Sequence, residues 1–246
     1  MDRMLYLAMS GASEMLQAQA AAAHNLANAN TNGFRADLNQ FRAMPVFGNG
    51  QPSRVYAMDE RPGMDMKPGA LIQTGNELDV AVKGEGWIAV QAPDGSEAYT
   101  RKGNLAISST GLLQTQDGLS VLGDAGPIAI PPFEKLEIAA DGTISVRAQG
   151  QDPNTISQVE RIRLVKPDKT QLVKGGDGLM HLPSGQKSPP DSTVTIVSGM
   201  LETSNVNALS EMANMISVQR QFELMVKAMN TAKENDAADA QLLRLV

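Results

Sequence analysis

The stretch that decides the fold lies near the start of the chain, at residues 4–29: MLYLAMSGASEMLQAQAAAAHNLANA. It contains no proline and is rich in alanine, the residue with the highest helix propensity, so we expect it to be helical. One set of mostly apolar residues recurs at alternating spacings of three and four, which keeps the set on one face of a helix, the seam that would meet a partner helix. This first stripe consists of Leu5, Ala8, Ala12, Met15, Gln19, Ala22 and Leu26.

The end of the chain repeats this pattern. We expect a helix that begins after Ser204 and Asn205, both good N-cap residues, and runs to about Lys233. Each of the two stripes has a glutamine in its middle, and a polar seam residue that meets a partner fixes the register between helices. The alternative is that each stripe is only the buried face of an ordinary amphipathic helix. The second stripe consists of Ala208, Met212, Met215, Gln219, Phe222, Val226 and Met229.

The exit from the first helix carries its own signal. Asn32 and Gly33 form a pair that tolerates positive φ angles, which ends a helix or makes a turn. We expect Asn28, Gly33 and Phe34 to fix the bend into the following domain. For Asn28 an ordinary helix stop is the alternative.

Between the helices the pattern changes to short alternating runs, which are typical of β-strands. Four Asp-Gly pairs, at 94–95, 117–118, 141–142 and 177–178, mark turns between them. No run is long enough for the crossover helices of a parallel sheet. The strand candidates are 78–82, 87–90, 111–115, 128–130, 143–146, 159–165, 179–182 and 193–197.

The sequence therefore predicts an α+β fold in which the terminal helices pair as a coiled-coil-like core and a mostly antiparallel β domain is inserted between them. We expect a discontinuous helical domain from residues 1–33 and 200–246. A linker or extended segment at 34–75 leads to the β-rich domain at 76–199.

Composition excludes several classes of function. The net charge of −6 and the lack of a basic run argue against binding to nucleic acid. The chain has no cysteine, which excludes disulfides, a thiol nucleophile and thiolate metal sites. No stretch approaches the ~18 apolar residues of a membrane span, and the first residues lack the features of a cleavable signal peptide.

No motif identifies a catalytic, cofactor or metal site. His24 and His181 are the only histidines, and we expect structural or surface roles for both. Residues 84–89, GEGWIA, match a loose dinucleotide fingerprint, but a strand follows the glycines where that motif needs a helix. Residues 175–178, GGDG, are a single copy of a calcium-roll repeat and predict a plain loop. A pair of carboxylates could still meet in space, although nothing singles one out.

Two blocks of sequence carry a family resemblance. Residues 25–35, NLANANTNGFR, are an Asn-rich helix end leading into Gly-Phe. Residues 201–207, LETSNVN, precede residues 215–223, MISVQRQFE. In these blocks, each at the expected end, the chain resembles the bacterial flagellar axial proteins of the rod and hook. The middle, with GEGWIAVQ at 84–91 and YTR at 99–101, is most similar to proximal rod proteins, and distal rod and hook proteins are close relatives.

The resemblance implies a structural subunit without enzymatic activity and without cofactors. It implies export by the flagellar type III apparatus, then polymerisation with copies of itself and with proximal and distal rod proteins. The product would be a helical tube that crosses the periplasm, with the terminal helices in its inner core. In that interpretation the two stripes, with Asn28, Gly33 and Phe34, form the assembly interface.

Two other classes stay open at this point. A distal rod or hook-type protein is the alternative within the family. A β-rich extracellular binding module with a helical stalk would explain the Gly- and Asp-rich loops, and a secreted hydrolase with a carboxylate pair ranks last.

Overall fold

The computed structural model describes residues 4–39, 41–45, 55–59, 63–148, 150 and 156–243. These residues form two compact units. The helical unit comprises the described residues within 1–29, 35–65 and 206–246, and the β unit comprises those within 30–34 and 66–205.

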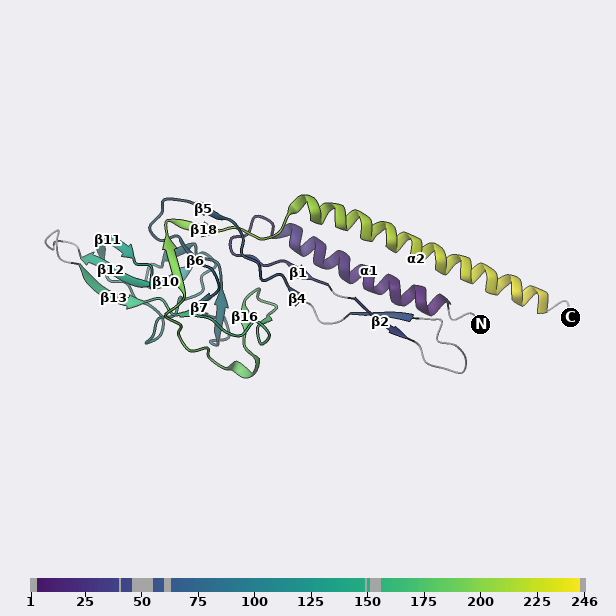
Figure 1. Ribbon diagram of the computed structural model, residues 1–246, viewed down its shortest axis with the longest axis horizontal. Helices are drawn as coiled ribbons and strands as arrows, with labels where there is room; N and C mark the ends of the chain where they lie inside the picture. The colour runs from purple at the N-terminus through teal and green to yellow at the C-terminus, as the bar shows by residue number, and fades with distance from the viewer. Residues whose placement is uncertain are drawn as a thin grey trace. The chain divides into compact units, whose positions relative to one another are not determined.

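Two long helices form the helical unit. α1 (Met4–Ala27) and α2 (Ala208–Leu243) lie side by side (Figure 1). A Cβ atom built on Gly11 would lie 3.4 Å from the sulfur of Met225, and Asn25 Nδ2 donates to Glu211 Oε1 at 3.5 Å. The early part of α1 thus faces the later part of α2, so the helices are antiparallel. The predicted pairing of the terminal helices is confirmed.

The start of α2 differs from expectation. The oxygen of Asn207 accepts the backbone N–H groups of Leu209 and Ser210, at 3.1 and 3.2 Å, which makes Asn207 the N-cap. Asn205 is used elsewhere, because its amide donates to the carbonyl of Lys67. The helix also passes the expected end at Lys233, since the alanines that follow favour a helix.

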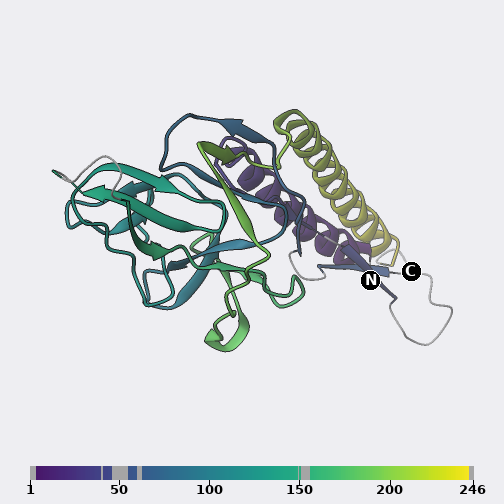
Figure 2. The same cartoon turned by 60° about the vertical axis from the view of Figure 1, so that its left-hand side comes forward.

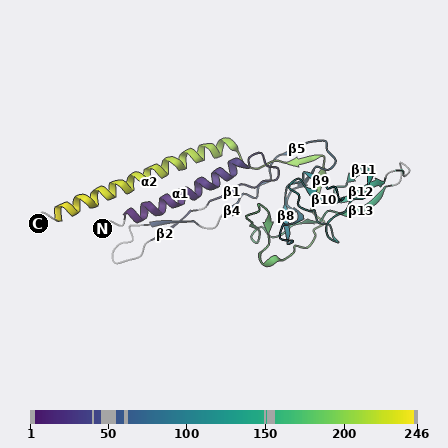
Figure 3. The same ribbon diagram turned by 180° about the vertical axis from the view of Figure 1, so that it is seen from behind.

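The residues that we expected as a linker or extended segment carry short strands. β1 (Asp37–Leu38) pairs with β4 (Gly63–Met64), and β2 (Phe41–Pro45) pairs with β3 (Val55–Asp59). β1 and β3 contact α1, and Figure 3 shows β1 and β4 running beside the helix.

The β unit is built from short antiparallel strands (Figure 2). Its main sheet has the order β14-β7-β8-β16-β15, a second sheet has the order β11-β12-β13, and three strand pairs, β10-β9, β17-β6 and β18-β5, complete it. All the pairings are antiparallel, which confirms the predicted α+β class. The bounds are β5 (Leu71–Gln73), β6 (Val80–Lys83), β7 (Trp87–Gln91), β8 (Glu97–Thr100), β9 (Leu105–Ile107), β10 (Leu113–Thr115), β11 (Phe133–Ile138), β12 (Thr143–Ala148), β13 (Ser157–Arg161), β14 (Leu164–Val165), β15 (Val173–Lys174), β16 (Met180–His181), the 3-10 helix η1 (Pro183–Gly185), β17 (Thr195–Ser198) and β18 (Met200–Glu202).

The core of the β unit is aliphatic, with Ile88, Val90, Leu113, Ile144 and Ile162 fully buried. The glycines of all four predicted Asp-Gly turns have positive φ angles, between 77° and 87°. The expected strand at 128–130 is wrong: its residue 129 makes only an isolated bridge, to Leu112. Prolines on both sides of this stretch explain the difference, because proline cannot donate to a strand ladder.

Candidate assembly surface

The inner face of α1 follows the first predicted stripe. Ala8, Ala12 and Ala22 are buried. Met15, Gln19 and Leu26 are half-buried, and Leu5, near the start, is 36% exposed. Small alanines at the centre let the two helix backbones approach closely, so much of this stripe is covered within the chain itself.

The inner face of α2 is rotated relative to the second predicted stripe. Its most buried residues are Val218 and Ala232, neither of which belongs to that stripe. Ala208, Met215, Phe222, Val226 and Met229 are half-buried, whereas Met212 and Gln219 are exposed. The seam is centred on Val218, one residue before the expected glutamine, because burying an amide without partners is unfavourable. Gln219 therefore does not occupy the seam between α1 and α2 of one chain, where we expected it to fix the register.

Each helix carries a second apolar face that sequence reasoning missed. On α1 this surface flanks the inner stripe: Met9 and Leu16, three residues before and four residues after the buried Ala12, are 56% and 52% exposed. On α2, Leu209 and Ile216 are 79% and 53% exposed. At 3.6 residues per turn, Ile216 lies about 200° around the helix from Val218, on the opposite face. The spacing of seven within each pair was the available signal. Tyr6, Met212 and Leu224 add further exposed apolar surface.

The end of α1 is held by asparagines. Asn28 Nδ2 donates to the carbonyl of His24 at 2.9 Å, which satisfies one of the free carbonyls at the helix end. Asn25, which the sequence did not single out as a site residue, is 3% exposed and bonds to the backbone of Asp37. His24 Nδ1 lies 2.6 Å from the carboxylate of Asp37, a structural role as expected.

Gly33 and Phe34 belong to the β unit. Gly33 has a φ of 68°, and a Cβ atom there would lie 2.4 Å from the carbonyl of Arg101, so only glycine fits. The ring of Phe34 lies under the ammonium of Lys174, which is 4.2 Å from the ring centre. Cation–π geometry of this kind holds Phe34 at the surface of the β unit.

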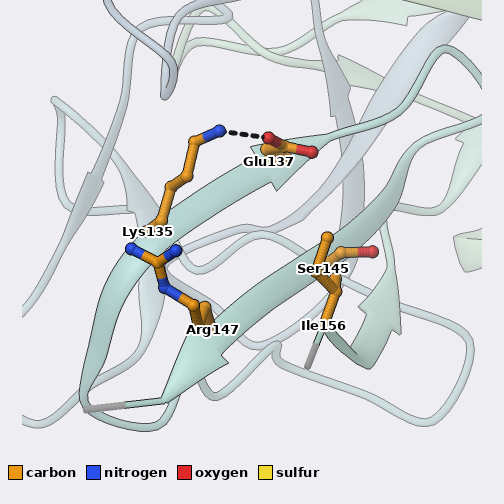
Figure 4. A pocket seen from close by; sticks show the side chains of 5 residues that line it. All are labelled: Lys135, Glu137, Ser145, Arg147 and Ile156. Atoms are coloured by element: carbon orange, nitrogen blue, oxygen red, sulfur yellow. Dashed lines mark hydrogen bonds and ion pairs between the residues drawn. The ribbon is translucent and has the colours of Figure 1, made fainter. Parts of the chain in front are cut away.

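The β unit has a small pocket at its surface. It lies on the sheet β11-β12-β13, lined by Lys135, Glu137, Ser145, Arg147 and Ile156 (Figure 4). Lys135 Nζ lies 2.5 Å from Glu137, which lowers the pKa of that exposed carboxyl, and Arg147 lies 3.4 Å from Glu134. These are ordinary surface ion pairs.

The second histidine is also structural. His181 Nε2 lies 3.0 Å from Asp177, four residues earlier, a pairing that we overlooked in the sequence. In the described part of the chain no three His, Asp or Glu side chains gather to hold a metal ion. Among the same residues, no helix has the length and apolar character to cross a membrane.

Family models match three parts of the chain. The model described as flagella basal body rod protein matches residues 5–35. The flagellar hook protein FlgE/F/G D1 domain matches 81–146, and the flagellar basal body rod FlgEFG protein C-terminal model matches 197–242. The paired terminal helices and the inserted β unit are therefore those of the rod and hook class of flagellar proteins.

Curated relatives match the chain along its length. It is 44% identical to the flagellar basal-body rod protein FlgF of Escherichia coli (strain K12), with 100% of both chains covered. It is 43% identical to FlgF of Salmonella typhimurium, again over 100% of both. FlgG of Buchnera aphidicola subsp. Schizaphis graminum is 32% identical over 86% of this chain and 88% of its own. The chain belongs to the flagellar basal-body rod protein family. Its function is that of a structural subunit of the rod.

Proposed function

We propose that this chain polymerises with copies of itself and with related axial subunits into the proximal part of the flagellar rod, a drive shaft that transmits torque. The observation that carries the proposal is the second apolar face on each terminal helix. Subunits that present such faces in a head-to-tail arrangement generate a helical polymer, because the contact does not close on itself.

The assembly interface combines predicted and newly found residues. The outer faces, with Met9 and Leu16 on α1 and Leu209 and Ile216 on α2, pack against neighbouring subunits. The exposed members of the predicted stripes, Leu5, Met212 and Gln219, extend this surface. The other residues of the two predicted stripes pack between α1 and α2 and so keep the helix pair in the shape that assembly needs: Ala8, Ala12, Met15, Gln19, Ala22, Leu26, Met215, Phe222, Val226 and Met229.

The rest of the proposal follows from family membership. In the rod its partners are proximal and distal rod proteins. Before assembly its partner is the flagellar export apparatus, which exports the chain without the need for a cleavable signal peptide. The assembled subunit lies in the periplasmic rod, and it carries out no chemical reaction. The FlgF proteins of Escherichia coli and Salmonella typhimurium match at higher identity than FlgG of Buchnera aphidicola, which favours the proximal role over the distal or hook-type one.

Replacing Ile216 with aspartate tests the proposal. This side chain is more than half exposed on the chain, so Ile216→Asp leaves the thermal unfolding of the monomer nearly unchanged. Burying an isoleucine contributes about 1.5–3 kcal/mol, and a buried unpaired charge costs more, so every contact in the polymer is weakened. We expect loss of motility and loss of the subunit from purified basal bodies.

Two further variants make the outcome specific. Gln221→Glu adds the same charge at an exposed polar position of α2, about 140° around the helix from Ile216, and should assemble normally. Val218→Asp places the charge on the inner face and should unfold the helix pair of the monomer itself. Normal motility of both Ile216→Asp and Leu209→Asp, with normal amounts in basal bodies, would refute an assembly role for the outer face.

A further inference from the structure

A buried ion pair lies where both terminal segments join the β unit. Arg101 directly follows β8, and Glu202 is the last residue of β18. Arg101 Nη1 lies 2.8 Å from Glu202 Oε2, and the two side chains are 4% and 1% exposed. Lys102–Asp117 and Lys135–Glu137, by contrast, are ion pairs at the surface.

The other polar atoms of the pair reach several segments of the chain. Arg101 Nη2 donates to the carbonyl of Gly84 at 2.6 Å, and Nη1 also donates to that of Val82 at 3.3 Å. Glu202 Oε1 accepts the backbone N–H of Gly69 at 2.9 Å. The guanidinium lies over the ring of Trp87, 5.4 Å from its centre. Because the planar guanidinium fork of Arg101 donates to several fixed partners, its position and orientation are fixed.

The backbone around Glu202 joins the two terminal segments to each other. Gly33 N–H donates to the carbonyl of Glu202 at 2.8 Å, and Asn205 N–H donates to that of Phe34 at 3.3 Å. Thr203 N–H donates to Ala70 at 2.8 Å. We call residues 31–34, 67–70 and 200–205 the arm root. Through it the chain enters the β unit after α1 and leaves it before α2.

Stability alone does not explain an ion pair at this position. Removing two charges from water is costly, and well-packed apolar residues of similar volume often replace a buried ion pair without loss. Apolar side chains cannot, however, bind the N–H of Gly69 or the carbonyl of Gly84. What the pair supplies beyond packing is therefore a fixed position for the backbone of the arm root.

We propose that Arg101 and Glu202 are positioning residues that hold the arm root in one conformation, so that both terminal segments leave the β unit in the geometry that the polymer needs. This inference rests on the proposed function. It assigns to the pair no direct contact with a neighbouring subunit.

The first test uses the monomer and does not depend on assembly. Glu202→Gln keeps the shape of the side chain and removes its charge, and Arg101→Lys keeps the charge and removes the fork. In both variants the amide hydrogens of Gly33 and Gly69 should exchange at least tenfold faster, while those of the core strand β12 stay protected.

Trp87 is the only tryptophan of the chain, so its fluorescence should shift to longer wavelength when the stacked guanidinium moves. Glu137→Gln, in an exposed pair, is the matched control and should change neither reading.

The second test separates positioning from stability. The double variant Arg101→Met with Glu202→Leu removes both charges at similar volume. We expect its β unit to unfold near the wild-type temperature, while the amides of Gly33 and Gly69 still exchange fast and incorporation into basal bodies falls at least tenfold. If the double variant does not fold, the exchange rates of the two single variants decide.

Three outcomes would overturn the inference: unchanged protection of Gly33 and Gly69 in Glu202→Gln, wild-type protection and incorporation of the double variant, or fast exchange together with normal incorporation. The last outcome would leave the proposed function intact, since the polymer would still form. Absence of the wild-type chain from basal bodies would instead refute the proposed function, and the exchange rates would still report on the arm root.

Discussion

The side-chain amide of Asn25 replaces a strand partner for Asp37: its Nδ2 donates to the Asp37 carbonyl at 2.9 Å, and its Oδ1 accepts the Asp37 N–H at 2.8 Å. Asn25 lies in the last two turns of α1, and Asp37 begins β1. These two hydrogen bonds hold the chain that follows the turn against α1. They do so inside the helical unit, where Asn25 is almost completely buried.

Replacing Asn25 with alanine should destabilise the helical unit by about 1–3 kcal/mol, because both backbone groups of Asp37 lose their partner in a partly buried place. The amide hydrogen of Asp37 should lose its protection against exchange. Asn28→Ala, which removes one bond on the exposed side, should cost less than about 1 kcal/mol. Equal effects of the two substitutions would contradict this assignment.

Gly33→Ala should destabilise the β unit strongly, since the new Cβ would overlap the backbone of Arg101 in addition to straining a positive φ angle. Gly84→Ala is the matched control: its φ is 75°, and a Cβ there meets nothing within 4 Å. It should cost only the conformational term of about 1–2 kcal/mol. Thermal unfolding of the two variants compares them. Similar melting temperatures would mean that the close approach of Gly33 to Arg101 does not matter.

Tyr99 should ionise only in strong alkali. Burial raises the pKa of its hydroxyl to about 12, and the hydroxyl accepts the Ser188 N–H at 2.8 Å and donates to Glu97 at 3.0 Å. A raised pKa contributes stability that is complete below about pH 10 and is lost as the pH approaches 12. The phenolate absorbance should show this late component in the wild type and lack it in Tyr99→Phe. A wild-type titration without it would contradict the buried hydroxyl.

Acid should weaken the β unit through its aspartate turns. Asp141 accepts the hydroxyl and the N–H of Thr143, and these bonds hold the pKa of the carboxyl below its usual range. Asp191 with Thr193, and Asp94 with Ser96, repeat the arrangement. A lowered pKa gives stability that is complete above about pH 4 and is lost as the pH falls below it.

The variant Asp141→Asn tests that link. It should be slightly less stable than the wild type at pH 7, and the difference should disappear near pH 2, as thermal unfolding at each pH will show. Asp124→Asn changes a surface carboxylate outside any such turn and should follow the wild type. A difference between Asp141→Asn and the wild type that persists unchanged in acid would have a cause other than ionisation.

The sequence predicted the features that depend on local pattern. The α1 stripe, the Asp-Gly turns and the antiparallel strands follow from spacing and from the conformations that glycine allows. It missed features that arise only when distant segments meet. The rotation of α2 toward Val218 arises where it packs on α1, and β3, which pairs with β2, contacts α1 as well.

The candidate site divides in the same way. Gly33 could be singled out because a turn glycine has a local signature. Arg101 and Glu202, 101 residues apart, carry no signature that links them, and the bonds of Asn25 to Asp37 are invisible before the chain folds back. The outer faces could have been predicted from the spacing of seven, but the prediction followed the inner stripes because they contain more residues.

We propose that neighbouring subunits cover the outer faces of α1 and α2 in the rod. Because the chain has no cysteine, single variants report on it directly. The most direct measurement is the maleimide reactivity of Ile216→Cys and Met9→Cys in monomers and in purified basal bodies, with the exposed Ser109→Cys of the β unit as the check that the reagent reaches the sample. We expect fast labelling of both variants in the monomer and at least tenfold slower labelling after assembly. Equal labelling of Ile216→Cys and Met9→Cys in the two states would contradict it.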